Sequence, residues 1–194
     1  MVFACQRNVQ RIRRTSFRVG VPQMVAIIVW SSVISMLLAK EVNQWFAMFG
    51  YVVIACGLLA LGIIDAVTHR VPRYINGLII TIAVPFIVLD ALVNWDLANL
   101  LRAGAGAVAL FVVYIVIGVA SRGGFGKGDV LLAPVVGFAL AYRDWSTLLT
   151  GTALTFIIAG VASAVLLATK RVGRRDHIAF GPYIAAGTLL SLIF

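Results

Sequence analysis

The sequence predicts an all-α polytopic integral membrane protein, a bundle of about seven transmembrane helices. Of its 194 residues, 62% are hydrophobic and only 12% are charged, whereas roughly a quarter of the residues in an ordinary soluble domain are charged. A soluble domain of this length has too little interior for so many apolar side chains. The mean hydropathy of +1.04 agrees with this conclusion. A soluble enzyme, a disordered chain and a disulfide scaffold are therefore excluded.

A helix needs about 20 apolar residues to cross the hydrocarbon core of a bilayer. Seven segments are predicted to do so: Val21–Ala39, Trp45–Ile64, Tyr74–Val93, Ala98–Ala120, Asp129–Tyr142, Ser146–Thr169 and Ile178–Phe194. The connections between them are short and carry most of the charge. We therefore predict a basic cytoplasmic or interfacial arm, residues 1–20, and a single transmembrane domain, residues 21–194.

The first segment, Val21–Ala39, follows a basic arm, and such a pattern is also typical of secretory signal peptides. Its roughly 19 apolar residues are too many for a signal peptide, and residues 38–41 make a poor cleavage site, so we predict a retained helix. Four arginines of the arm share one helical face: Arg7, Arg11, Arg14 and Arg18. This pattern indicates a basic amphipathic helix on anionic lipid. A frayed tail that only sets the topology is the alternative.

The later segments differ in the residues that interrupt their apolar runs. The third and fifth contain Pro85 and Pro134, which predict kinks. Gly104 and Gly106 in the fourth predict close helix packing there. The second and fifth also carry acidic residues near one end.

Basic residues are unevenly divided between the two sides of the predicted bundle. Thirteen of the 16 lie in the N-terminal arm and in the loops after the second, fourth and sixth segments. Three lie on the other side: Lys40, Arg102 and Arg143. Because cytoplasmic loops are enriched in Lys and Arg, the N-terminus is predicted to be cytoplasmic and the C-terminus to lie outside.

Two acidic side chains are predicted to lie within the membrane region, where ionisable groups are costly and are usually functional. Asp65 lies near the end of the second segment, and Asp129 opens the fifth. Since successive helices alternate in direction, both carboxylates are expected near the cytoplasmic face. The other acidic residues are assigned to the outer side or to a loop: Glu41, Asp90, Asp96, Asp144 and Asp176.

Two carboxylates in one site can hydrolyse a peptide bond without a metal. Held close together they share a proton, so one acts as a general base on water and the other as an acid toward the peptide carbonyl. Gly126 and Gly128 make a loop with little side-chain bulk, which an extended substrate can approach. Simpler interpretations remain open: Asp129 as a helix N-cap, and Asp65 as the end of a helix at the interface.

These residues resemble the motifs of a known family. Residues 126–129, Gly-Lys-Gly-Asp, match the GxGD motif of intramembrane aspartyl proteases. Asp65 followed by Val71-Pro72 matches the first motif of the type IV prepilin peptidases, and residues 180–187 resemble the final helix of that family. Together the three features cover the chain from about Ala55 to the C-terminus.

The resemblance implies an aspartyl endopeptidase that removes the short basic leader from prepilins or pseudopilins at the cytoplasmic face of the bacterial inner membrane. It makes Asp65 and Asp129 the catalytic pair, and Gly126, Lys127 and Gly128 loop or substrate-binding residues, with no cofactor. Larger members also have a cytoplasmic domain with paired CxxC motifs and methylate the new pilin N-terminus. This chain has no paired CxxC motifs. The resemblance therefore implies a short form without methyltransferase activity.

Two other function classes remain open. A small proton-coupled transporter would use Asp65 and Asp129 as a proton relay, and a non-catalytic membrane assembly factor would use them only as caps. The position of both acids near one face, rather than at the midplane, disfavours the transporter. Cys5 and Cys56 form no ligand cluster, so no metal is predicted. The expected partners are pilin precursors and membrane lipids, and not nucleic acid.

Overall fold

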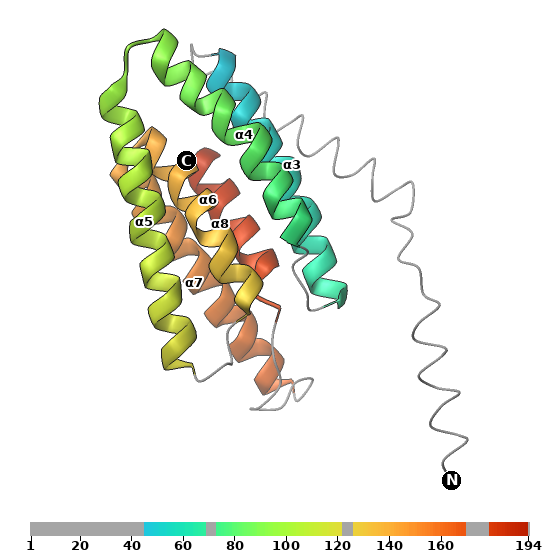
Figure 1. The fold of residues 1–194 in the computed structure, drawn as a ribbon. Coiled ribbons are helices and arrows are strands. Elements are labelled where there is room, and N and C mark those ends of the chain that lie inside the picture. Colours follow the sequence, from blue (N-terminus) through green and yellow to red (C-terminus); the bar gives the residue numbers. More distant parts are fainter. Residues whose placement is uncertain (1–44, 69–72, 122–125, 170–178, 194) are drawn as a thin grey trace, which may run out of the picture.

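The computed structural model describes residues 45–68, 73–121, 126–169 and 179–193, and these form a bundle of helices without strands (Figure 1). The helices are α3 (Trp45–Thr68), α4 (Arg73–Val93), α5 (Leu97–Ala120), α6 (Lys127–Arg143), α7 (Trp145–Ala168) and α8 (Gly181–Ile193). The all-α prediction is confirmed for this part of the chain, and each predicted segment from Trp45 onward coincides with one helix. The arm and the segment Val21–Ala39 lie outside the described residues, as do three basic loops, so the predicted orientation stays a prediction.

Length separates these helices into two groups. Four of them are long and apolar enough to cross a membrane: α3 over Trp45–Ala66, and α4, α5 and α7 over their whole lengths. Helices α6 and α8 have 17 and 13 residues. They rise about 26 Å and 20 Å, which is less than the ~30 Å thickness of the hydrocarbon core. The described residues thus form a helical membrane bundle, and the number of seven spans stays a prediction.

Aspartates begin two of the helices. Asp96 precedes α5, and its side chain accepts a hydrogen bond from the Asn99 backbone N–H at 3.3 Å. Asp144 precedes α7 and accepts from the Ser146 N–H at 3.2 Å. Each carboxylate satisfies an N–H group that would otherwise lack a partner in the first turn.

The connections are short, so consecutive helices run antiparallel, and the end of α3 lies at the same end of the bundle as the starts of α6 and α8 (Figure 1).

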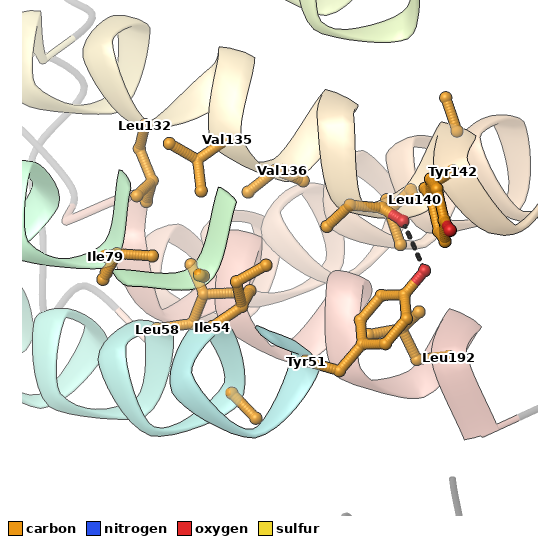
Figure 2. Close-up of a cluster of buried hydrophobic side chains, with 14 of the residues drawn as sticks. Tyr51, Ile54, Leu58, Ile79, Leu132, Val135, Val136, Leu140, Tyr142 and Leu192 are labelled. Atoms are coloured by element: carbon orange, nitrogen blue, oxygen red, sulfur yellow. Dashed lines mark hydrogen bonds between the residues drawn. The ribbon is translucent and has the colours of Figure 1, made fainter. Parts of the chain in front are cut away.

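Helix α6 lies at the centre of the bundle, where it packs against α4, α5, α7 and α8. Figure 2 shows Leu132 and Val136 of α6 facing Ile54 and Leu58 of α3 and Ile79 of α4. Since all five side chains are buried, the core surrounds α6 and fixes its position.

Close backbone contact through glycine fixes α6 against α5. A Cβ atom on Gly137 would lie 2.5 Å from the carbonyl oxygen of Gly106, and one on Gly106 would collide with the Cβ atom of Ala141. Small residues allow such close approach between membrane helices. The predicted role of Gly106 in packing is confirmed, whereas no atom lies within 4 Å of the Cβ position of Gly104.

The short helices begin inside the bundle. Arg143, at the end of α6, donates from Nη1 to the Leu192 carbonyl at the end of α8, at 2.8 Å, so their C-terminal ends lie together. Helix α7 has 24 residues and rises about 36 Å. The first turns of α6 and α8 therefore stop short of the ends of α5 and α7, as Figure 1 shows.

Candidate active site

Asp65 lies in α3, one turn before the helix ends at Thr68, and is only 5% exposed. Its Oδ2 accepts a hydrogen bond from the backbone N–H of Gly181, the first residue of α8, at 2.9 Å. The N-terminus of a helix carries unpaired N–H groups and a partial positive charge, which stabilise a carboxylate. The carboxyl group of Asp65 is therefore buried within the bundle and bonded to another helix.

Asp129 lies in the first turn of α6 and is 4% exposed. The N-cap of this helix is Gly126, so the interpretation of Asp129 as the N-cap is wrong. The Oδ1 atom of Asp129 is buried and has no hydrogen-bond partner among the residues that the structure describes. A buried acceptor without a donor is costly. A hydrogen-bond donor from outside the described residues would therefore stabilise Oδ1 of Asp129.

The fold brings these two acids together. Asp65 and Asp129 interact electrostatically although 64 positions separate them in the sequence. Tyr114 of α5 is buried and also lies within electrostatic reach of Asp129. The prediction that both acids lie at one end of the bundle is therefore confirmed.

A glycine lies against each carboxyl group. A Cβ atom on Gly126 would lie 2.6 Å from Oδ2 of Asp129, and one on Gly181 would lie 2.8 Å from Oδ2 of Asp65. Gly128 is the second residue of α6 and is half-buried. The side chain of Lys127 lies outside the described part, so its predicted role stays a prediction. No role was predicted for Gly181 individually, although the family resemblance of residues 180–187 had singled out its segment.

Aromatic rings pack beside the pair. Tyr114 of α5 lies 6.0 Å from Phe156 of α7 and 6.4 Å from Phe180, measured between ring centroids. Phe180 in turn contacts Phe156 at 5.7 Å and Tyr183 at 6.2 Å. These edge and tilted contacts are the arrangements that aromatic pairs prefer. Since Tyr114 lies near Asp129 and Phe180 precedes Gly181, which bonds to Asp65, the aromatic cluster lies close to both acids.

A third buried acid, Asp90 of α4, was missed by the sequence analysis, which assigned it to the outer side. It is 0% exposed and lies at the end of the bundle opposite Asp65. Its Oδ1 accepts from the Ala47 N–H at 3.1 Å, and its Oδ2 accepts from the Tyr142 hydroxyl at 3.0 Å. Both oxygens of Asp90 are thus paired, in contrast to Oδ1 of Asp129.

The family model of the type IV leader peptidases matches residues 52–168, a range that contains both Asp65 and Asp129. This chain belongs to the type IV leader peptidase family. It is 31% identical over 140 residues to the prepilin leader peptidase/N-methyltransferase of Bacillus subtilis (strain 168). That match covers 70% of the chain and 53% of the relative, so the chain spans about half the length of the relative. No solved structure matches the chain.

Proposed function

We propose that this chain is an aspartyl endopeptidase that removes the short basic leader from type IV prepilins or pseudopilins. The observation that carries the proposal is the burial of Asp65 and Asp129 together at one end of the bundle, each with a glycine against its carboxyl group. Membership of the leader peptidase family supports the choice of substrate. The glycine against each carboxyl group leaves that side of the acid without side-chain bulk, which suits an extended peptide backbone.

The hydrogen bonds of the two acids suggest different roles. Asp65 accepts an N–H bond at the start of α8, an arrangement that suits an anion, so we assign it as the base that takes a proton from water. The resulting hydroxide adds to the peptide carbonyl carbon. Asp129, with Oδ1 lacking a described partner, gives its proton to the carbonyl oxygen. Collapse of the tetrahedral intermediate breaks the C–N bond, and the leaving amine takes the proton held by Asp65. One hydroxyl of the intermediate re-forms the carbonyl and returns its proton to Asp129, so both acids recover their starting states.

The charge of the loops predicted at this end of the bundle suggests where cleavage takes place. We place it at the cytoplasmic face of the bacterial inner membrane, because the loops predicted at this end carry most of the basic residues. A hydrophobic pilin segment can then remain in the membrane while the leader stays in water. Cys5 and Cys56 form no CxxC motif, and the proposal concerns leader removal alone.

Reconstitution tests the proposal. The full chain is placed in phospholipid vesicles with a prepilin that has a short basic leader before its hydrophobic segment, and the product is followed by its size and N-terminal sequence. We expect a single cut that releases the leader. A folded protein that leaves this prepilin intact across the pH range in which it remains folded would contradict the proposal.

Gly126→Ala is expected to lower kcat for leader removal by about 100-fold, since a displacement of about 1 Å in a reacting group can have that effect. The added Cβ would collide with Oδ2 of Asp129. The φ of −66° and ψ of 128° at Gly126 suit alanine, so the thermal unfolding midpoint should not change. Gly104→Ala is the matched control, because its Cβ meets nothing within 4 Å. Equal activity of the two variants would count against the predicted contact.

A further inference from the structure

Asn76 is a buried polar residue in the first turn of α4 to which no role has been assigned above. It is 6% exposed, and its Nδ2 donates a hydrogen bond to the carbonyl oxygen of Leu131 in α6, at 2.8 Å. Its Oδ1 is buried and has no hydrogen-bond partner among the described residues. Only the donor end of the amide is therefore engaged within the described part of the chain, and that end connects α4 to the helix that carries Asp129.

The point of contact is a weak part of α6. Pro134 lies inside this helix and has no N–H to donate to the carbonyl of Val130, and its ring crowds that same carbonyl. Proline therefore kinks a helix and weakens the connection between the turns on either side. Leu131 lies in the turn that Pro134 disturbs. The Asn76 amide thus donates from another helix to the carbonyl next to the one that Pro134 leaves without its helical donor.

The bond lies where α4 meets α6. Helix α4 packs against α6 less extensively than α5 does, so this one bond is a larger part of the contact on the α4 side of α6. Asp129 precedes Leu131 by two residues, or ~3 Å along the helix axis. A shift of the Leu131 turn would therefore move the Asp129 carboxyl group relative to Asp65, and proton transfer depends on such distances.

We propose that Asn76 is a positioning residue: its carboxamide holds the first turn of α6 against α4 and thereby sets the position of Asp129 relative to Asp65. The inference rests on the proposed function of the two acids. Asn76 does not touch the reacting atoms in this scheme, and it acts through the backbone of α6.

The first test is Asn76→Leu, which keeps a similar size and removes the donor. Leader removal is measured with the reconstituted chain and the prepilin described above. We expect kcat to fall by about 10- to 100-fold, with KM within about twofold of wild type. Asn94→Leu is the matched control, because Asn94 lies beyond the last residue of α4, and its Nδ2 bonds to the Asp90 carbonyl in α4 itself, at 2.9 Å. It should leave kcat unchanged.

A double-mutant cycle with Pro134→Ala separates positioning from a general loss of stability. Alanine restores the missing N–H in α6, so its first turn should depend less on the amide, and the kcat loss on Asn76→Leu should be several-fold smaller in the Pro134→Ala background. Asn76→Thr, which keeps a donor, should retain an intermediate kcat and provides the comparison if Asn76→Leu does not fold.

Three outcomes would overturn the inference. Wild-type kcat in Asn76→Leu, or an equal loss in both backgrounds, would show that the amide does not position Asp129, while leaving the proposed function intact. If the wild-type chain does not cleave the prepilin, the proposed function and the inference are both wrong.

Discussion

Asp65→Asn and Asp129→Asn are each expected to reduce leader removal by at least about 10³-fold, the scale that loss of a proton-transfer group produces. Asparagine has nearly the same size as aspartate, but its amide neither takes up nor releases a proton at any pH at which the protein remains folded. In the Asp65→Asn variant the amide oxygen can still accept the Gly181 N–H bond that the carboxylate accepts in the wild type, so the fold should persist. Release of the leader is measured under single-turnover conditions, with thermal unfolding recorded for each variant.

The double variant provides a sharper test of the pair. Because the two acids act in one reaction, removing both should cost little more than removing either one. Losses that multiply would instead indicate independent roles. Substantial cleavage after either single change, in a folded protein, would contradict the assignment of Asp65 and Asp129 as the catalytic pair.

Asp90→Leu should be among the most destabilising changes in the described part of the chain, with a loss of about 3 kcal/mol or more in the free energy of unfolding. It would leave the Ala47 N–H and the Tyr142 hydroxyl without their acceptor in the core. Unfolding of the chain in mixed detergent micelles, at increasing fractions of denaturing detergent, measures the loss.

Asp90→Asn is the matched variant, and it should be much milder. The asparagine Oδ1 can accept the Ala47 N–H, and its Nδ2 can donate to the Tyr142 hydroxyl, which accepts as well as donates. The same Asp-to-Asn change should therefore abolish cleavage at Asp65 and Asp129 and spare it at Asp90. Complete loss of cleavage in folded Asp90→Asn would mean that the third acid takes part in the chemistry.

The amino-acid sequence was sufficient to predict the helices and the shared location of two acids. Long apolar runs have few structural alternatives in a bilayer, where every backbone group needs an internal partner. Each crossing reverses the direction of the chain, so counting helices places Asp65 and Asp129 at the same end. Neither step requires knowledge of how the helices pack.

From the sequence, Asp90 was assigned to the outer side without its burial being predicted, and Asn76 was not singled out. Both omissions have one cause, because burial depends on how the helices pack. Both faces of a membrane helix are apolar, since lipid and protein core are equally apolar surroundings. Periodicity therefore does not reveal which face of α4 is turned inward. Asp90 lies near a predicted helix end, a position that suits an interfacial acid as well as a buried one.

The sequence by itself thus determined the class of fold, the helices of the described part and the end of the bundle at which the two acids lie. Only the tertiary structure decided which polar groups are buried and what they contact. The bond from Gly181 to Asp65 joins residues 116 positions apart, and that from Asn76 to Leu131 joins residues 55 apart. Such contacts depend on the rotation and depth of whole helices. These are decided by packing between helices, as in the close approach of Gly106 of α5 to Gly137 of α6, and not by any local pattern.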